Sequence, residues 1–129
     1  MIKKRISILF LATVMSISIS SIFNSKTAQA KYYSATGKVS LYLGQGKIGY
    51  DGTVITGSDC ATNLSTDNPP AGTPIYVTDL SNGTKGTFYK YDVGNFPSGV
   101  ILDLTYNGFV VKFGYLGGDG YFHGTYYHY

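Results

Sequence analysis

Hydrophobic and polar residues alternate most regularly in two stretches near the middle of the chain. In the stretch 73–79, Ile75 and Val77 share one face, and Tyr76 and Thr78, which carry hydroxyl groups, share the other. This two-residue period is typical of a half-buried strand. A Ser-Asn-Gly turn at 81–83 leads into the stretch 87–93, where the alternation resumes. The pattern predicts an antiparallel pair of strands.

The rest of the pattern also favours short strands joined by turns. It predicts strands over 32–43 with a break at Gly37, over 100–104 and over 121–127, a short hairpin over 47–56 with Asp51-Gly52 as its turn, irregular chain over 57–72, and one helical turn over 106–109 capped by Thr105. In the stretch 87–93 we expect Phe88, Lys90 and Asp92 on one face and the intervening residues on the other.

The first 30 residues have the pattern of a secretory signal peptide. A basic start at residues 3–5 precedes an apolar run over 6–23 that serines interrupt, and Ala28-Gln29-Ala30 matches a cleavage site. A membrane anchor is the alternative, but the serines make the run too polar for a stable span. We therefore expect a secreted, extracellular protein with one domain over residues 31–129 and no stable membrane anchor after cleavage.

Removal of the signal peptide changes the charge balance. Residues 31–129 contain six Lys, seven Asp, no Glu and no Arg, so their formal charge is −1. A chain without a basic excess lacks the main electrostatic contribution to nucleic-acid binding, and we expect no nucleic-acid partner. The seven Asp are also the only acidic side chains available for catalysis.

The expected domain contains all 17 Gly and all 13 Tyr of the chain. Tyrosine and glycine with little Ala or Glu favour strands and turns over helices. Tyrosine combines a large apolar ring with a hydroxyl group, so this excess fits a sugar-stacking surface and fits a core of amphipathic rings equally well.

Cys60 is the only cysteine, so an internal disulfide is excluded. We expect it to be buried in a monomer; if it were exposed, it would allow a disulfide-linked dimer. His123 and His128 are five residues apart, which in a strand places them on opposite faces. The sequence predicts neither a metal site nor a cofactor.

Three segments together resemble a known family. They are Gly72-Thr73-Pro74-Ile75-Tyr76-Val77-Thr78-Asp79-Leu80 before Asn82-Gly83, then Tyr91-Asp92-Val93-Gly94-Asn95-Phe96, then Gly99-Val100-Ile101-Leu102-Asp103-Leu104-Thr105, with Asn107-Gly108-Phe109 and Gly114 after them. In order and spacing they resemble double-psi β-barrel proteins of the rare lipoprotein A and expansin type. The resemblance covers about residues 72–114.

The resemblance implies an all-β fold with a minor helix, a six-stranded double-psi β-barrel with a shallow open groove. It also implies binding to a cell-wall polysaccharide, either peptidoglycan or glucan. Asp92 and Asp103 match the functional acids of the family. The family's Arg after the first acid is Val93 here, and its Pro is Asn95. This loss of polar support favours binding over bond cleavage.

The residues around Asp103 give an independent reason to consider it. Its strand neighbours are apolar, and desolvation raises the pKa of a carboxyl group and keeps it protonated. Such a group serves as a general acid on a glycosidic oxygen, whereas Asp92 at a strand end stays ionised. The alternative is a structural acid that accepts backbone hydrogen bonds or caps the turn at Thr105.

The sequence therefore leaves three functions open. The first is an expansin-like protein that binds polysaccharide without cleaving it, with sugar-stacking rings chosen from Tyr91, Phe96, Tyr106, Tyr121 and Tyr126. The second is a lytic transglycosylase or glycosidase with Asp103 and Asp92 as catalytic residues. The third is a secreted interaction protein or inhibitor that uses the barrel as a scaffold.

Overall fold

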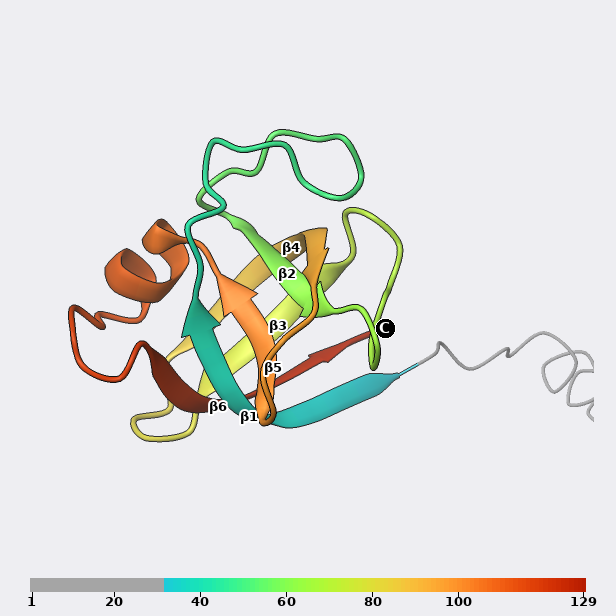
Figure 1. Ribbon diagram of the computed structural model, residues 1–129. Coiled ribbons are helices and arrows are strands. Elements are labelled where there is room, and N and C mark those ends of the chain that lie inside the picture. Colours follow the sequence, from blue (N-terminus) through green and yellow to red (C-terminus); the bar gives the residue numbers. More distant parts are fainter. Residues whose placement is uncertain (1–31) are drawn as a thin grey trace, which may run out of the picture. The chain divides into compact units, whose positions relative to one another are not determined.

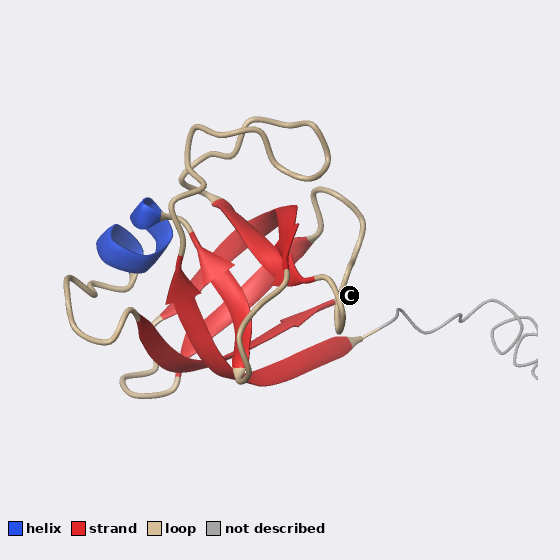
Figure 2. Cartoon of the chain, in the orientation of Figure 1, coloured by secondary structure: helices blue, strands red, loops and turns tan. Residues whose placement is uncertain are grey.

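The computed structural model describes residues 32–129, and the signal peptide expected over residues 1–30 lies outside the described residues. This part of the chain forms six strands and one short helix (Figures 1 and 2). In chain order they are β1 (Tyr33–Leu41), β2 (Asp59–Asn63), β3 (Pro74–Asp79), β4 (Lys85–Gly94), β5 (Val100–Leu104), the π-helix η1 (Asn107–Lys112) and β6 (Tyr121–His128).

The six strands close into a barrel in the order β1-β5-β2-β4-β3-β6, and β6 pairs with β1. The β1·β5 and β2·β4 pairs are parallel, and the other four pairs are antiparallel. Parallel neighbours require crossing connections, which interleave the two halves of the chain in the double-psi arrangement (Figure 1). The prediction of an all-β barrel is confirmed.

The interior of the barrel is filled by side chains from every strand. The fully or nearly fully buried apolar residues of the core are Val39, Cys60, Ile75, Val77, Phe88, Leu102, Leu104, Phe109, Phe113, Phe122 and Tyr126. Ile75 and Val77 lie on the buried face of β3, and Tyr76 and Thr78 lie on its outer face. The two-residue alternation in this strand is therefore a direct consequence of barrel closure.

The prediction of irregular chain over 57–72 is wrong in its first half. Residues 59–63 form β2, which lies between β4 and β5 in the barrel. The burial pattern of β2 is continuous rather than alternating, because even the outward-facing Ala61 is covered. A five-residue strand without alternation cannot be separated from loop by periodicity.

The expected break at Gly37 is also wrong, because β1 runs through it without interruption. A Cβ atom at Gly37 would lie 2.8 Å from the Gly99 carbonyl oxygen and 2.9 Å from a side-chain carbon of Ile101. Glycine is needed here for the close approach of β1 to the chain before β5. The register of the β1·β5 pair shifts directly after this point, between Lys38 and Val39.

The predicted helical turn forms, but longer than expected and without the expected cap. The helix runs over Asn107–Lys112, and no side chain caps its start. The Thr105 hydroxyl group instead donates to the carbonyl of Gly57 at 3.2 Å, which joins the end of β5 to the start of the β2 region. Phe109 fixes the helix because its buried ring packs into the end of the barrel.

A bulge in β4 reverses the predicted face of Asp92. Cys60 pairs with Lys90, but the next residue, Ala61, pairs with Asp92, so Tyr91 is an extra residue in β4. Phe88 and Lys90 point into the barrel as expected. After the bulge Asp92 lies in register with Ala61 on the outer side.

Candidate functional site

The most prominent feature outside the barrel is the segment 42–58 between β1 and β2, here called the apical loop, which projects from one end of the barrel (Figure 1). The predicted hairpin lies within it as a single bridge between Ile48 and Val54. Backbone hydrogen bonds of 2.8 Å join Gly46 to Ile55, Ile55 to Lys47 and Gly49 to Thr53. The loop therefore has a defined conformation of its own.

The apical loop exposes apolar side chains. Leu43, Ile48 and Val54 are 73%, 74% and 55% exposed, and Tyr50 near its tip is 64% exposed. Tyr106, at the start of η1, lies beside the base of the loop and shares a pocket of about 320 Å³ with Tyr42, Leu43 and Gln45. Apolar side chains gathered on a projecting loop are typical of an interaction surface.

Two contacts with β4 hold this loop on the barrel, one through an acid of the loop and one through an acid of the strand. Asp51 pairs with the buried Lys90 Nζ at 3.5 Å. The Tyr50 backbone N–H donates to Asp92 Oδ1 at 2.9 Å. The buried side chain of Ile55 adds an apolar anchor. Contacts with β4 thus fix the tip of the apical loop, while the apolar side chains of the loop remain exposed to solvent.

The two acids predicted from the sequence lie in one row across the barrel. Ser40 pairs with Asp103, Asp103 pairs with Ala61, and Ala61 pairs with Asp92. Two strand spacings separate the Cα atoms of the acids, about 10 Å. Ser40 donates a short hydrogen bond to Asp103, and the Val93 backbone N–H donates to Asp92 at 3.0 Å.

Burial affects the ionisation of the groups in this row. Burial raises the pKa of Asp103; the hydrogen bond from Ser40 opposes the shift, and the nearby charge of Asp92 adds to it. Burial, followed by the charge of Asp92, also raises the pKa of the Tyr42 hydroxyl group. The row therefore combines a carboxyl group whose pKa is raised by burial with a second one that accepts backbone hydrogen bonds.

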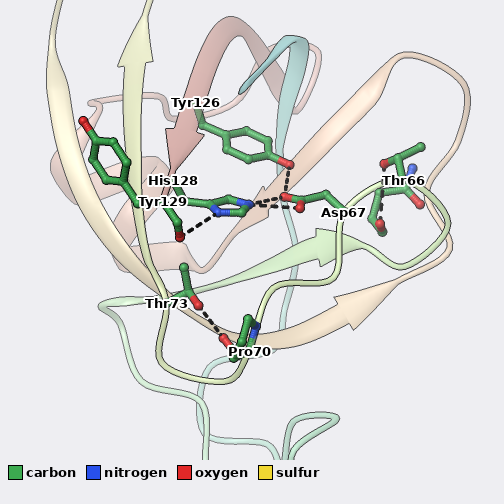
Figure 3. Close-up of polar contacts among 8 residues, drawn as sticks. Thr66, Asp67, Pro70, Thr73, Tyr126, His128 and Tyr129 are labelled. Carbon is green, nitrogen blue, oxygen red and sulfur yellow. Dashed lines mark hydrogen bonds and ion pairs between the residues drawn. The ribbon is translucent and has the colours of Figure 1, made fainter. Parts of the chain in front are cut away.

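A second polar cluster, which the sequence did not indicate, attaches β6 to the segment that follows β2. Asp67 accepts a 2.8 Å hydrogen bond from the Tyr126 hydroxyl group, and its oxygens lie 2.9 and 3.0 Å from His128 Nε2 (Figure 3). All three residues are buried, and the ring of Tyr33 stacks on that of His128 at 5.5 Å. This cluster attaches the segment after β2 to β6.

The aromatic residues predicted to stack on sugar have different positions. Tyr126 is 1% exposed and belongs to the core, so its assignment to a sugar-binding surface is wrong. Tyr91, Phe96 and Tyr121 are half-buried. Tyr106 is exposed and lies beside the apical loop, where it lines a pocket with Tyr42, Leu43 and Gln45.

Cys60 is buried, as expected, and burial raises the pKa of its thiol. His123 is exposed and His128 is buried, which agrees with opposite faces of β6. Within residues 32–129 no cluster of three or more His, Cys, Asp or Glu side chains is arranged to hold a metal ion. The helix of the described chain is too short to cross a membrane.

Sequence reasoning missed the apolar residues of the apical loop as a possible site. Ile48 and Val54 flank a turn in a short hairpin, a pattern that usually indicates a strand pair packed on a core. The sequence did contain one indication that the hairpin is not packed on a core. Gly46, Gly49 and Gly52 leave it with few side chains that could be buried. Because the barrel is closed, it has no free strand edge with which the hairpin could pair, and this is visible only in the tertiary structure.

The fold and the projecting loop place the chain in a structural class, that of small closed β-barrels that display an ordered surface loop. The Streptomyces papain inhibitor has a similar structure, with a TM-score of 0.54 and 21% sequence identity over 74% of this chain and 93% of that chain. At this identity the similarity shows the fold.

The chain is also 37% identical over 78 residues to the uncharacterized protein YdjM of Bacillus subtilis (strain 168). That match covers 60% of this chain and 62% of the relative, so the matched part spans less than two thirds of YdjM. No family model matches the chain.

Proposed function

We propose that the chain is a secreted interaction protein that inhibits a peptidase through its apical loop, with the barrel as a rigid scaffold. The observation that carries the proposal is the combination of exposed apolar side chains with a fixed loop conformation: Ile48, Tyr50 and Val54 are more than half exposed on a loop anchored to Lys90 and Asp92. The fold shared with a protein named as a papain inhibitor supports the choice of partner.

Physical reasons favour this use of the loop. A loop that is ordered before binding loses little conformational entropy in the complex, so more of its contact energy appears as affinity. Tyrosine side chains are frequent anchors of protein interfaces because they bury a large ring and retain a hydrogen-bonding tip. The hydrogen bond that Asp92 accepts from Tyr50 supports a positioning role for this acid.

Inhibition assays on the protein recovered from expression of the full chain test the proposal. Papain comes first, followed by serine, aspartic and metal-dependent peptidases. For any peptidase that the parent protein inhibits, we expect Tyr50→Ala to weaken inhibition about tenfold or more, since truncation of an interface anchor costs ~2 kcal/mol of binding free energy. Leu116→Ala is the matched control, because Leu116 is 82% exposed and lies outside the apical loop.

The proposal fails if no peptidase of the panel is inhibited or bound. It also fails if Tyr50→Ala and Leu116→Ala weaken inhibition equally. Thermal unfolding of both variants shows whether the barrel is intact, and we expect little change because both side chains are exposed.

The row of acids favours a second candidate, the binding or cleavage of cell-wall polysaccharide at Asp103 and Asp92. The two acids lie in one row with their Cα atoms about 10 Å apart, and inverting glycosidases hold their two carboxyl groups roughly 6.5–9.5 Å apart with a water between them. Release of soluble fragments from purified peptidoglycan or glucan, lost in Asp103→Asn, is the expected result. Binding without release would support the expansin-like alternative, and neither binding nor release would exclude both.

A further inference from the structure

Tyrosine side chains gather where β1 begins and β6 ends, and neither proposed function uses them. Tyr33 pairs with His128 across these two antiparallel strands, so Tyr32 and Tyr129 are the next residues outward and lie opposite each other. Figure 1 shows the start of β1 beside the end of β6. The fold thus brings together two tyrosines from opposite ends of the described chain.

The rings of Tyr32, Tyr127 and Tyr129, here called the tyrosine cluster, are mutual neighbours. The centroid of the Tyr32 ring lies 5.7 Å from that of Tyr127 and 5.9 Å from that of Tyr129. The centroids of Tyr127 and Tyr129 are also 5.9 Å apart. Tyr32 and Tyr129 are 61% and 65% exposed, so a reagent or an enzyme in solution reaches both rings.

The three rings differ in how they meet. Tyr127 stacks on Tyr32 with an angle of 25° between the planes, and on Tyr76 with an angle of 28°. Tyr127 is therefore held between neighbours within β6. Tyr32 and Tyr129 instead meet edge to face, with an angle of 61° between their planes. Because the carbons ortho to the hydroxyl group lie on the ring edge, this arrangement brings such a carbon toward the other ring.

The other tyrosines of residues 32–129 lack this combination of contact and exposure. Outside the stack, Tyr33 and Tyr126 have ring centroids 5.9 Å apart, but Tyr126 is 1% exposed and its hydroxyl group donates to Asp67. Tyr50 is 64% exposed, yet it belongs to none of the ring pairs in the described part of the chain. Tyr32 and Tyr129 therefore differ from both.

The chain has no other side chains that could join its two ends covalently. Small secreted domains commonly rely on disulfides, because their cores are modest. Cys60 is the only cysteine here and is buried, so the expected secreted domain cannot form an internal disulfide. Two exposed tyrosines in contact across the β1·β6 pair offer a different cross-link.

We propose that Tyr32 and Tyr129 are a site of oxidative cross-linking, at which a haem peroxidase and hydrogen peroxide join the two rings by a carbon–carbon bond. Oxidation removes one electron and the hydroxyl proton from each phenol. The two phenoxyl radicals bond through ring carbons ortho to the oxygens, and the hydrogens of those carbons move to the oxygens. The two electrons and two protons that are removed reduce one hydrogen peroxide molecule to two water molecules.

The position of the bond gives it a structural consequence. All six strands lie between Tyr32 and Tyr129, and the β1·β6 pair closes the barrel. A cross-link that closes a long loop removes much of the conformational entropy of the unfolded chain. The oxidised protein should therefore unfold at a higher urea concentration than the untreated protein.

Treatment with horseradish peroxidase and hydrogen peroxide tests the proposal on the protein recovered from expression of the full chain. The protein is kept dilute, and the monomeric product is digested with trypsin. We expect the peptide over residues 32–38 to be linked to the peptide over residues 113–129, with a mass two hydrogen atoms below the sum of the two. Dityrosine fluorescence should appear in the same product.

Phenylalanine variants assign the bond, because phenylalanine keeps the ring and has no hydroxyl group to oxidise. Tyr32→Phe and Tyr129→Phe should each abolish the linked peptide, and neither should gain resistance to urea on oxidation. Tyr127→Phe should retain the linked peptide. Tyr50→Phe is the control for an exposed tyrosine outside the cluster, and it should behave as the parent protein does.

Three results would overturn the proposal. The first is no linked peptide in the parent protein under conditions that convert free tyrosine to dityrosine. The second is a linked peptide that persists in Tyr129→Phe, which would assign the bond to another residue. The third is cross-linking only between two protein molecules.

The test is independent of the proposed peptidase inhibition. The tyrosine cluster contains no residue of the apical loop, so Tyr129→Phe should inhibit a peptidase as the parent protein does. Cross-linking is measured without a peptidase, so a failure of the proposed inhibition leaves this result unaffected.

Discussion

At the scale of single residues, the environment of Asp103 determines its charge. Its carboxyl group is half-buried, accepts a hydrogen bond from Ser40 and lies in the same row as Asp92. Burial is the largest influence, and it raises the pKa above its usual value. The folded protein thus holds the proton more tightly than the unfolded chain does.

This pKa shift predicts how Asp103 affects stability. A group whose pKa is raised in the folded state stabilises the fold below the unfolded pKa of about 4, and this contribution is lost as pH rises through the folded pKa. We therefore expect Asp103→Asn to stabilise the protein relative to the parent at pH 7 more than at pH 3. Urea unfolding at the two pH values measures the difference.

The control for this experiment is Asp119→Asn, because Asp119 is exposed in the turn before β6. It should show the same small effect at both pH values. An Asp103→Asn variant with equal stability changes at pH 3 and pH 7 would contradict the assignment of a raised pKa.

At the scale of elements, the apical loop depends on a contact with β4. Lys90 has only 2% of its side chain exposed, and its ammonium group pairs with Asp51. A buried charge is tolerated when it has a partner, and removal of the partner is more costly than replacement of the whole pair. The loop and the strand therefore stabilise each other.

We expect Asp51→Ala to destabilise the protein by about 3 kcal/mol, because Lys90 would be left buried and unpaired. Urea unfolding measures this change. The double variant Asp51→Ala/Lys90→Met should recover much of the loss, since a buried methionine needs no partner. A destabilisation of Asp51→Ala no larger than that of Lys47→Ala, an exposed control in the same loop, would show that the pair contributes little.

At the scale of the whole molecule, the barrel is closed by the β1·β6 pair and secured by the Asp67 cluster. Eight residue pairs join β1 to β6. Asp67 then links the chain after β2 to Tyr126 and His128 near the C-terminus. Segments about 60 residues apart in the sequence are thereby held together.

Asp67→Ala should therefore destabilise the whole barrel by about 2 to 4 kcal/mol, because two buried polar groups on β6 would lose their partner. Cooperative unfolding in urea, followed by tyrosine fluorescence and circular dichroism, measures the effect. Asp119→Asn again serves as the control. If the transition of Asp67→Ala coincides with that of the parent protein, the cluster does not secure the closure.

The sequence by itself determined the elements whose residues alternate. The strand over Pro74–Asp79 follows from the two-residue hydrophobic period, the strand over Val100–Leu104 from a short apolar run, and the barrel class from the resemblance over residues 72–114. The burial of Cys60 followed from its residue type. The two strands and the burial of Cys60 are local features, because each depends on neighbours within a few positions or on the chemistry of one side chain, whereas the barrel class came from the resemblance alone.

Only the tertiary structure decided the rest, because it depends on contacts between distant segments. β2 is a strand because β4 and β5 flank it, although its own sequence shows no alternation. The bulge at Tyr91 places Asp92 opposite Ala61, and closure leaves the hairpin at Ile48 and Val54 in solvent. Sequence patterns report the period of a strand, whereas register, closure and exposure arise only when the six strands pack together.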